Sequence, residues 1–562
     1  MNSRLGSAVL AFFLLGSGAA LAQPADLILR NGRIHTVDAA SRTVQAVAIR
    51  DGRFIAVGTD EEATAAGGPA TRVVDLAGRT AVPGLIDNHL HQILMAITSS
   101  NVKLIEARSI ADVQRAIRER ARATPPGQWV VAFNGWHESL LAEGRMPTRQ
   151  EIDEATRDHP VLIPRGGHVV TVNTRALEAA GITRDTPNPP GGVIVRDPAT
   201  GEATGVLLQN AANLVRRVAP PPPPPAEQAR LLEATMRELN SYGITSVIEP
   251  GIDERSIAVY RSLRDAGRMT VRTDILYRAM RLEDVRKGIT ALQAERSDEW
   301  LRFVGIKFPL DGGVEGGRMS EPYRLVPGEQ NDPTYRGVLL LPPGGESEYV
   351  DGLKAVAEAG LQAQTHAVGD ETIDLIVRAY GRIAKETRPI RDLRWAIMHI
   401  FLPSDAALAG MREIGIAATA QNHPVLLGHN QRRWWGDERA AYAIPIRKML
   451  EAGVLTGGGT DGPVVPVDPF LSLWWMTTRG TLNGYTLGPE HAIAPSDALR
   501  LYTIANARIM GVERERGSIE VGKLADLAVL SQDILAVAPN EIRRTSALIT
   551  LVGGREVYRS GM

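Results

Sequence analysis

The middle of this 562-residue chain alternates short apolar strands with amphipathic helices, and this order restricts the fold more than any other feature. Alternation of this kind favours a parallel α/β sheet or barrel, because parallel strands need a crossover connection that is usually helical. Eight segments have strand character, the number that closes a (β/α)8 TIM-like barrel. In chain order they are Val82–His89, Thr245–Pro250, Val271–Tyr277, Phe303–Leu310, Gln362–His366, Arg394–His399, Ile416–Gln421 and Val454–Thr460.

The two ends of the chain have a different sequence pattern, with short segments of alternating apolar and polar residues separated by Gly and Asp-Gly turns. We therefore expect one small antiparallel β-sandwich built from residues 23–82 and 515–562, and a barrel over residues 83–514. The segment from about 128 to 219 does not fit the barrel repeat, so we interpret it as an inserted lid. The proline run Pro220–Pro225 would be a stiff, extended exit from that lid.

The N-terminus has the pattern of an export signal. Arg4 precedes an apolar run that ends in Ala20-Leu21-Ala22, so we expect a signal peptide over residues 1–22. The run is short for a membrane span, and a chain without cysteine cannot carry a lipoprotein anchor. No later segment is apolar for long enough to cross a bilayer. We expect an exported protein without a membrane anchor, which would be periplasmic in a Gram-negative host.

Composition limits the partners and the metal ligands. The net charge of -1 gives no electrostatic reason to expect binding to nucleic acid. The absence of cysteine excludes disulfides, thiolate ligands and a cysteine nucleophile. Any bound metal must therefore be held mainly by histidines and carboxylates.

The stretch "TAVPGLIDNHLHQIL" places His89 and His91 at the end of the first barrel strand. An isolated pair of this kind is often structural, and a metal site needs further ligands. In this chain, residues of the right type stand at the ends of other strands, where barrel active sites form. Together they suit one or two ions of Zn, with Mn or Fe as alternatives. The candidate ligands are His89, His91, Lys307, His366, His399 and Asp461.

At this point the chain resembles the amidohydrolase superfamily, and within it the amidohydrolase family 3 branch that includes N-substituted formamide deformylases. The resemblance is carried by "VPGLIDNHLH", "MPTRQEID", "GGHVVTVNTRAL", "GIKFPLDG", "THAVGD", "MHI", "GGTDGPVVPVDPF" and "GSIEVGKLADLAVL". It implies that His89 and His91 bind one metal and that His366 and His399 bind a second. It also implies that Lys307 is carboxylated and bridges the two ions, and that Asp461 contacts a metal and moves the proton of the attacking water.

Alternatives remain for two of these residues. Lys307 could instead form an ion pair with a nearby acid such as Asp311, and Asp461 could cap the turn that follows the eighth strand. The chain also departs from the family pattern in "FPLDGGVEGGRMSEPY" and at three histidines. We interpret these histidines as pocket or surface residues; they are His137, His423 and His429.

The candidate substrate-binding residues are Trp136, His168, Asp311 and Gln421. His168 is also a catalytic candidate together with Asp461, since it follows Gly166 and Gly167 at a turn that would expose its ring. In that hypothesis the lid brings His168 to the carbonyl or the leaving group of the substrate. The alternative is a small packing domain whose histidine bonds its own loop.

The function that we predict is metal-dependent hydrolysis of a non-peptide C–N bond in a small amide or formamide, through a metal-activated water. A serine hydrolase is disfavoured, because no G-x-S-x-G elbow is present. Two alternatives stay open, namely an esterase or lactonase on the same metal centre and an exported binding protein without turnover. A homodimer is one assembly that the sequence allows.

Overall fold

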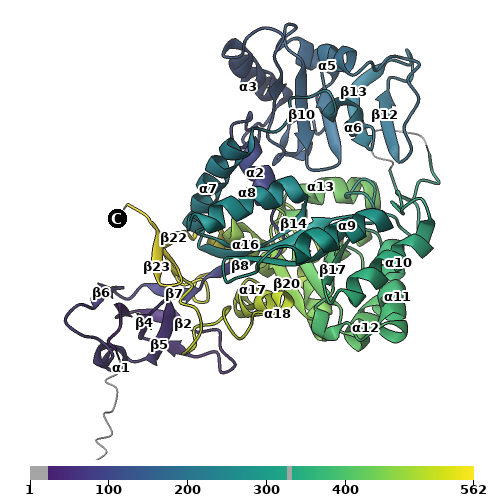
Figure 1. Ribbon diagram of the computed structural model, residues 1–562. Helices are drawn as coiled ribbons and strands as arrows, with labels where there is room; N and C mark the ends of the chain where they lie inside the picture. The colour runs from purple at the N-terminus through teal and green to yellow at the C-terminus, as the bar shows by residue number, and fades with distance from the viewer. Residues whose placement is uncertain (1–22, 326–331, 562) are drawn as a thin grey trace, which may run out of the picture.

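The computed structural model describes residues 23–325 and 332–561, so the expected signal peptide lies outside the described residues. Its centre is a sheet of eight parallel strands in the order β20-β19-β18-β17-β16-β15-β14-β8 (Figure 1). The first and last of these strands meet where the amide of Asn88 donates to the carbonyl of Gly458 at 3.3 Å. The expected TIM-like barrel is therefore confirmed. The strands are β8 (Leu85–Asp87), β14 (Ile244–Ile252), β15 (Arg272–Arg278), β16 (Leu301–Pro309), β17 (Gln362–Ala367), β18 (Ala396–His399), β19 (Ala417–Gln421) and β20 (Thr456–Gly459).

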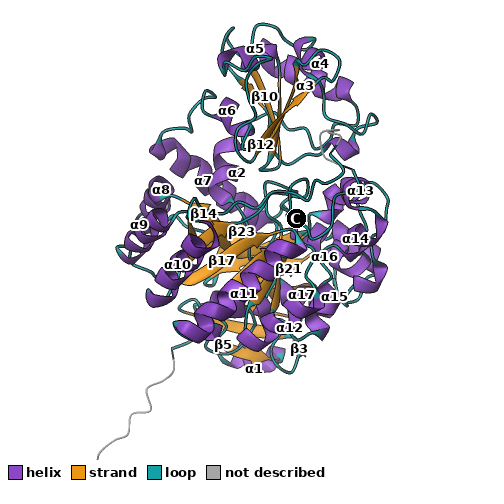
Figure 2. Cartoon of the chain, turned by 90° about the vertical axis from the view of Figure 1, so that its right-hand side faces the viewer, coloured by secondary structure: helices purple, strands orange, loops and turns teal. Residues whose placement is uncertain are grey.

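Helices surround these strands (Figure 2). The outward side chains of the strands are buried against the helices. The main core lies between strands and helices and includes Ile248, Leu276 and Ile306. The helices are α2 (Gln92–Thr98), α7 (Pro225–Ser241), α8 (Glu254–Asp265), α9 (Leu282–Gln293), α10 (Gly345–Glu358), α11 (Asp370–Glu386), α12 (Asp405–Ile414), α13 (Pro424–Trp435), α14 (Asp437–Tyr442), α15 (Ile446–Glu451), α16 (Pro469–Thr478), α17 (Pro495–Leu501) and α18 (Ile504–Met510).

The predicted first strand, Val82–His89, is two strands in the structure. β7 (Thr80–Pro83) pairs with strands of the terminal sheet, whereas β8 alone enters the barrel. Gly84 joins them at a point where a Cβ atom would lie 2.3 Å from the hydroxyl oxygen of Thr245. Only glycine can therefore bring the chain so close to β14, and the change of sheet takes place there.

Two sheets lie beside the barrel (Figure 1); both chain ends contribute to one of them, and the other is built from the N-terminal segment alone. One sheet combines β2, β3 and β7 with β21, β22 and β23, and the other has the order β5-β4-β1-β6. Their facing side chains share one core that includes Phe54, Leu76 and Leu551. The expectation of an antiparallel unit was wrong in part, because β1 pairs with β6 and β2 with β7 in parallel. The bounds are β1 (Leu27–Arg30), β2 (Arg33–His35), β3 (Thr43–Val44), β4 (Ala46–Arg50), β5 (Arg53–Gly58), α1 (Asp60–Ala65), β6 (Arg72–Asp75), β21 (Leu527–Leu530), β22 (Ala547–Val552) and β23 (Arg555–Arg559).

The insertion stands over one end of the barrel with its own five-stranded sheet, β12-β13-β11-β10-β9 (Figure 1). Its core also takes in α3, because Val113 and Ile117 pack with Ile163 and its neighbours. This packing unit therefore begins before the expected start near residue 128. Its elements are α3 (Ile110–Arg122), β9 (Val130–Val131), α4 (Arg149–Asp153), β10 (Val161–Arg165), β11 (Val169–Val172), α5 (Thr174–Ala179), β12 (Gly192–Arg196), β13 (Ala203–Gln209) and α6 (Ala212–Arg216).

Within the described ranges, no helix combines the length and the apolar character that a membrane span requires.

Candidate metal centre

His89 and His91 follow β8 and turn toward one point. The carboxylate of Asp87, the last residue of β8, accepts hydrogen bonds from the amides of His89 and Thr460, which ties the His89 loop to the end of β20. The ring centroids of His89 and His91 are 5.2 Å apart. Burial lowers the pKa of His89 to about 3, so its ring is neutral at pH 7. A neutral imidazole is the form that binds a metal.

Asp461, just after β20, is the carboxylate at that point. Its amide donates to the carbonyl of His89 at 2.7 Å, and its φ of 61° places it in the left-handed region. Its Oδ1 lies 3.3 Å from Nε2 of His89 and 3.2 Å from Nε2 of His91. Burial alone would raise the pKa of Asp461, but the surrounding histidines, His89 foremost, hold it well below its usual range. The carboxylate is therefore ionised at neutral pH.

His366 and His399 complete the polar end of the barrel from adjacent strands. Their ring centroids are 4.5 Å apart, and the ring of His399 is 4.7 Å from that of His89. Nε2 of His366 lies 3.1 Å from the carbonyl oxygen of Gly312, which orients this ring. Burial and then neighbouring histidines lower the pKa of His399 well below its usual range, so His399 also stays neutral.

Lys307 lies in β16 and is buried. Burial lowers the pKa of its amine to about 8, because a charged ammonium is poorly solvated there. The alternative ion pair with Asp311 is not formed: Asp311 instead accepts hydrogen bonds from the amides of Val368 and Gly369 and lies 3.2 Å from His366. Carboxylation of Lys307 stays a prediction.

The donor atoms at this end of the barrel fit a metal ion. Both ring nitrogens of His89, Nδ1 of His399 and Oδ1 of Asp461 are buried and have no hydrogen-bond partner among the described residues. Buried polar atoms without partners are rare in folded proteins and call for an explanation. Two groups have ligand atoms within 4.8 Å of one another, and they share Asp461: one adds His89 and His91, and the other adds His399 and His423. Nitrogen and carboxylate ligands without thiolate suit Zn, Mn or Fe.

The insertion reaches the same space through His168. The ring centroid of His168 is 5.9 Å from that of His366, and its Nδ1 lies 2.8 Å from Oε1 of Gln209. Since an amide oxygen only accepts, Nδ1 carries the proton and Nε2 is left as an acceptor. Burial lowers the pKa of His168 to about 4, which keeps the ring neutral.

A buried ion cluster fastens the insertion beside His168. Arg165, the last residue of β10, lies 3.0 Å from Glu138 of the insertion and 3.1 Å from Glu315, which follows β16. Asn430 of α13 donates to Glu138 at 2.8 Å. These contacts join the lid to the loop after β16 and to helix α13 of the barrel. They hold the β10–β11 turn, which carries His168, at a defined place.

The other three predicted substrate-binding residues form hydrogen bonds with other groups of the protein. Trp136 is buried in the core of the insertion and donates its indole N–H to the carbonyl of Pro164 at 2.8 Å. Asp311 supports the turn after β17, as described above. Gln421 accepts from the amide of His399 and donates to Asn88, both at 3.1 Å. Direct substrate contact by Trp136, Asp311 and Gln421 stays a prediction.

Two residues of the site were not predicted as metal ligands or catalytic residues, since His423 was interpreted only as a pocket or surface residue and Glu249 was not singled out. His423, two residues after β19, places Nε2 at 2.9 Å from Oδ2 of Asp461. Glu249, in β14, accepts from the hydroxyl of Tyr260 at 2.7 Å and lies 3.8 Å from Nδ1 of His91. The signal for His423 was its place after a barrel strand, and the signal for Glu249 was a lone acid in an apolar strand.

Comparisons with known proteins agree with this architecture. A model of the amidohydrolase family matches residues 72–558. The N-substituted formamide deformylase of Arthrobacter pascens is 31% identical over 547 residues, which are 95% of this chain and 98% of that protein.

Two solved structures share the fold. An uncharacterized metal-dependent hydrolase from Pyrococcus horikoshii has a TM-score of 0.70 at 23% identity, covering 91% of this chain and 99% of its own. The atrazine chlorohydrolase TrzN from Arthrobacter aurescens, complexed with zinc, has a TM-score of 0.53 at 16% identity, covering 95% of both chains. At these identities the likeness is one of fold.

Proposed function

The chain belongs to the amidohydrolase family, and from that membership we propose that its substrates are N-substituted formamides or closely related small amides. It is a metal-dependent hydrolase that acts on C–N bonds other than peptide bonds. Membership of an enzyme family disfavours the binding protein without turnover. The formamide class is supported by the relative from Arthrobacter pascens, whose similarity extends over 95% of this chain.

The observation that carries the metal chemistry is the convergence of His89, His91 and Asp461, with contacts of 3.2 and 3.3 Å between the carboxylate and both rings. These three residues would hold a divalent ion, which we propose to be zinc. When bound, such an ion polarises a carbonyl oxygen and lowers the pKa of a water molecule.

His366, His399 and a carboxylated Lys307 are the residues that the family resemblance proposes for a second ion. A carbamate would replace a poorly solvated ammonium with two anionic oxygens, which suits the buried position of Lys307. An intact-mass measurement under carbon dioxide tests this modification.

Asp461 from the barrel and His168 from the insertion would both act on the substrate. The ionised Asp461 would accept a proton from the attacking water and pass it to the leaving nitrogen. The neutral His168 offers Nε2 as an acceptor, which suits the N–H of the scissile amide better than the oxyanion that develops on the carbonyl oxygen. Of the two roles predicted for His168, we therefore favour contact with the leaving group.

The experiment is a panel of N-substituted formamides, the matching acetamides and the matching formate esters, assayed with the zinc-loaded protein. We expect the highest kcat/KM for the formamides. Turnover of acetamides alone would contradict the formamide class, and turnover of esters without any amide would support the esterase alternative.

Export is a separate proposal that rests on the N-terminal sequence. Arg4, the apolar run after it and the Ala20-Leu21-Ala22 motif would direct the chain to the periplasm of a Gram-negative host. Cell fractionation with N-terminal sequencing tests this. A product in the cytoplasm that retains residues 1–22 would contradict it.

A further inference from the structure

Two arginines, Arg278 of the barrel and Arg216 of the insertion, have no role in the function proposed above. Arg278 is the last residue of β15 and is paired in register with Lys307 of β16. The residue before it, Tyr277, points outward, because a Cβ atom on Gly288 of α9 would lie 2.4 Å from the Tyr277 ring. Side chains alternate along a strand, so Arg278 points to the inner side of the barrel at its carboxyl end.

Gly251 of β14 shows how close Arg278 is to the candidate metal centre. A Cβ atom on Gly251 would lie 3.4 Å from Cδ of Lys307 and 3.8 Å from Cβ of Arg278. The base of the Arg278 side chain therefore lies beside Lys307, which is a predicted metal ligand.

Arg216 approaches the same end of the barrel from α6 of the insertion. Its Nη2 donates to the carbonyl of Gly167 at 2.9 Å, which holds the guanidinium against the turn that carries His168. The ring of His168 is in turn 5.9 Å from that of His366. The surrounding protein lowers the pKa of Arg216, and the charge of Arg278 lowers it further. The two guanidinium groups are therefore close enough to repel each other.

The charges of Arg216 and Arg278 are not matched by the protein. Within residues 23–325 and 332–561, neither guanidinium forms an ion pair with a carboxylate, and the Arg278 side chain has no hydrogen bond. Solvent reaches both side chains, although the surrounding protein lowers the pKa of each. Arg165 of the insertion, by contrast, is buried and pairs with Glu138 and Glu315. Arg216 and Arg278 are thus cations that a ligand can reach.

We propose that Arg216 and Arg278 together bind a carboxylate on the N-substituent of the amide substrate. A guanidinium group donates two parallel hydrogen bonds to a carboxylate, and an anion between two such groups offsets their mutual repulsion. The N-substituent is favoured over the acyl group because Arg216 is bonded beside His168, to which we assigned the leaving group. The inference rests on the proposed function and narrows its substrates to amides of amines that carry a carboxylate, such as N-formyl amino acids.

The test compares two substrates that differ in charge, N-formylphenylalanine and its neutral primary amide, N-formylphenylalaninamide. Formate release gives kcat and KM for both compounds with the zinc-loaded full chain. The variants are Arg216→Gln, Arg278→Gln and Arg278→Lys, of which only the last keeps a positive charge. The matched control is Arg217→Gln, because Arg217 is the exposed neighbour of Arg216 and its side chain has no hydrogen bond or ion pair in the part of the chain that the structure describes.

The wild type and Arg217→Gln should prefer the carboxylate in kcat/KM by about 10-fold or more, the usual worth of a hydrogen bond between charged groups. Each Gln variant should lose most of this preference. The loss should appear mainly in KM, because the carboxylate is bound equally in the ground state and the transition state. Arg278→Lys should keep more of the preference than Arg278→Gln.

A wild type that hydrolyses the neutral formamide without preferring the carboxylate would overturn the inference and leave the proposed function intact. An equal loss for both substrates in Arg278→Gln would also overturn it, since Arg278 would then act through Lys307. A wild type that releases no formate from either compound would contradict the proposed function, and the inference with it. Thermal melts of each variant show whether it is folded.

Discussion

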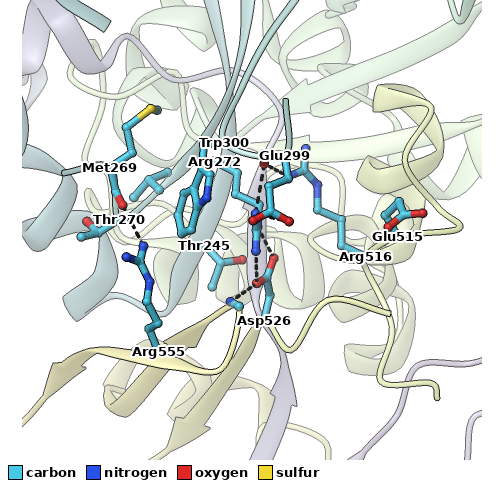
Figure 3. Close-up of polar contacts among 12 residues, drawn as sticks. Thr245, Met269, Thr270, Arg272, Glu299, Trp300, Glu515, Arg516, Asp526 and Arg555 are labelled. Carbon is cyan, nitrogen blue, oxygen red and sulfur yellow. Dashed lines mark hydrogen bonds and ion pairs between the residues drawn. The ribbon is translucent and has the colours of Figure 1, made fainter. Parts of the chain in front are cut away.

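The two ends of the barrel both hold buried polar groups, and the pair of Arg272 and Asp526 at one end differs from His89 at the other in how its polar atoms are paired. At the amino end of the strands, Arg272 donates from Nε and Nη2 to the two oxygens of Asp526, at 2.9 and 3.1 Å (Figure 3). Trp300 lies between the guanidinium groups of Arg272 and Arg555, each 4.5 Å from its ring. At the carboxyl end, both ring nitrogens of His89 have no hydrogen-bond partner among the described residues.

This difference separates a stabilising cluster from a functional one. The pair of Arg272 and Asp526 joins β15 to the chain just before β21 (Figure 3). Asp526 also accepts from the amide of Gly553 at 2.7 Å. Its charges are matched by protein partners, as expected for the face of a barrel that supports stability. The donors at the other end are arranged for a partner that the chain itself does not supply.

Removal of a metal ligand should produce the largest difference in activity between changes at the two ends of the barrel. His89→Ala should lower kcat/KM by at least about 10³-fold, because a metal ion contributes several kcal/mol to the transition state, and it should lower metal content. The matched control is His35→Ala, since His35 bonds Thr43 and Asp533 through both ring nitrogens. That variant should lose stability but keep its metal. Wild-type metal content in His89→Ala would contradict the comparison.

Loss of Asp526 should have the opposite effect, lowering stability and leaving kcat unchanged. Asp526→Ala leaves the buried charge of Arg272 without its carboxylate, which typically costs about 3–5 kcal/mol of unfolding free energy. The value of kcat for the folded protein should stay close to that of the wild type. Urea unfolding and steady-state kinetics measure both quantities, with Glu227→Ala as the control for an exposed ion pair. A fall in kcat without a loss of stability would show that the two ends are not separable.

Asp461→Asn tests whether the shared carboxylate acts as a proton carrier in addition to a ligand. The amide keeps the size and one oxygen but cannot accept the proton, so kcat should fall by at least about 10²-fold, as for typical general acid–base groups. Substrate affinity should change less, because the lost interaction belongs to the transition state. Metal analysis and kinetics are measured on the same sample. Near-normal kcat in a fully metallated variant would move the proton step to another residue, with His168 the first to examine.

The smallest expected effect on kcat/KM comes from His168 in the lid. His168→Ala should lower kcat/KM by about 10-fold, the equivalent of one hydrogen bond to the substrate. Metal content should not change. His159→Ala is the control inside the insertion, since both of its ring nitrogens bond within that segment. Equal kinetics for His168→Ala and the wild type would make His168 a packing residue.

The sequence predicted the barrel and most of its polar end for one reason. Carboxyl ends of parallel strands meet at one face, so residues such as His89, His366, His399 and Asp461 can be assigned to that face from strand order alone. The same rule applied to His423 but was not used, because this histidine departs from the family pattern. Whether such residues share a site depends on the distances between their side chains. These distances cannot be obtained from the order of the strands.

Other features depended on packing that no local pattern reveals. Trp136 was predicted as a substrate contact from its place in the insertion; the structure buries its indole in the core of that insertion, and contact with substrate stays a prediction. The break at Gly84 depends on the close approach of Thr245, which is distant in the sequence. Glu249 stood in an apolar strand, and only the fold places it beside His91.

Removal and return of the metal test most directly whether the histidines and Asp461 at the carboxyl end of the barrel form a catalytic metal site. Protein is dialysed against a chelator until metal content is negligible, and kcat/KM is measured on the best amide of the panel before and after zinc is restored. Activity should fall together with metal content and return with zinc. The cluster of Arg272 and Asp526 should keep the chain folded throughout, as monitored by circular dichroism. Full activity in folded protein without metal would contradict a catalytic metal site at this end of the barrel.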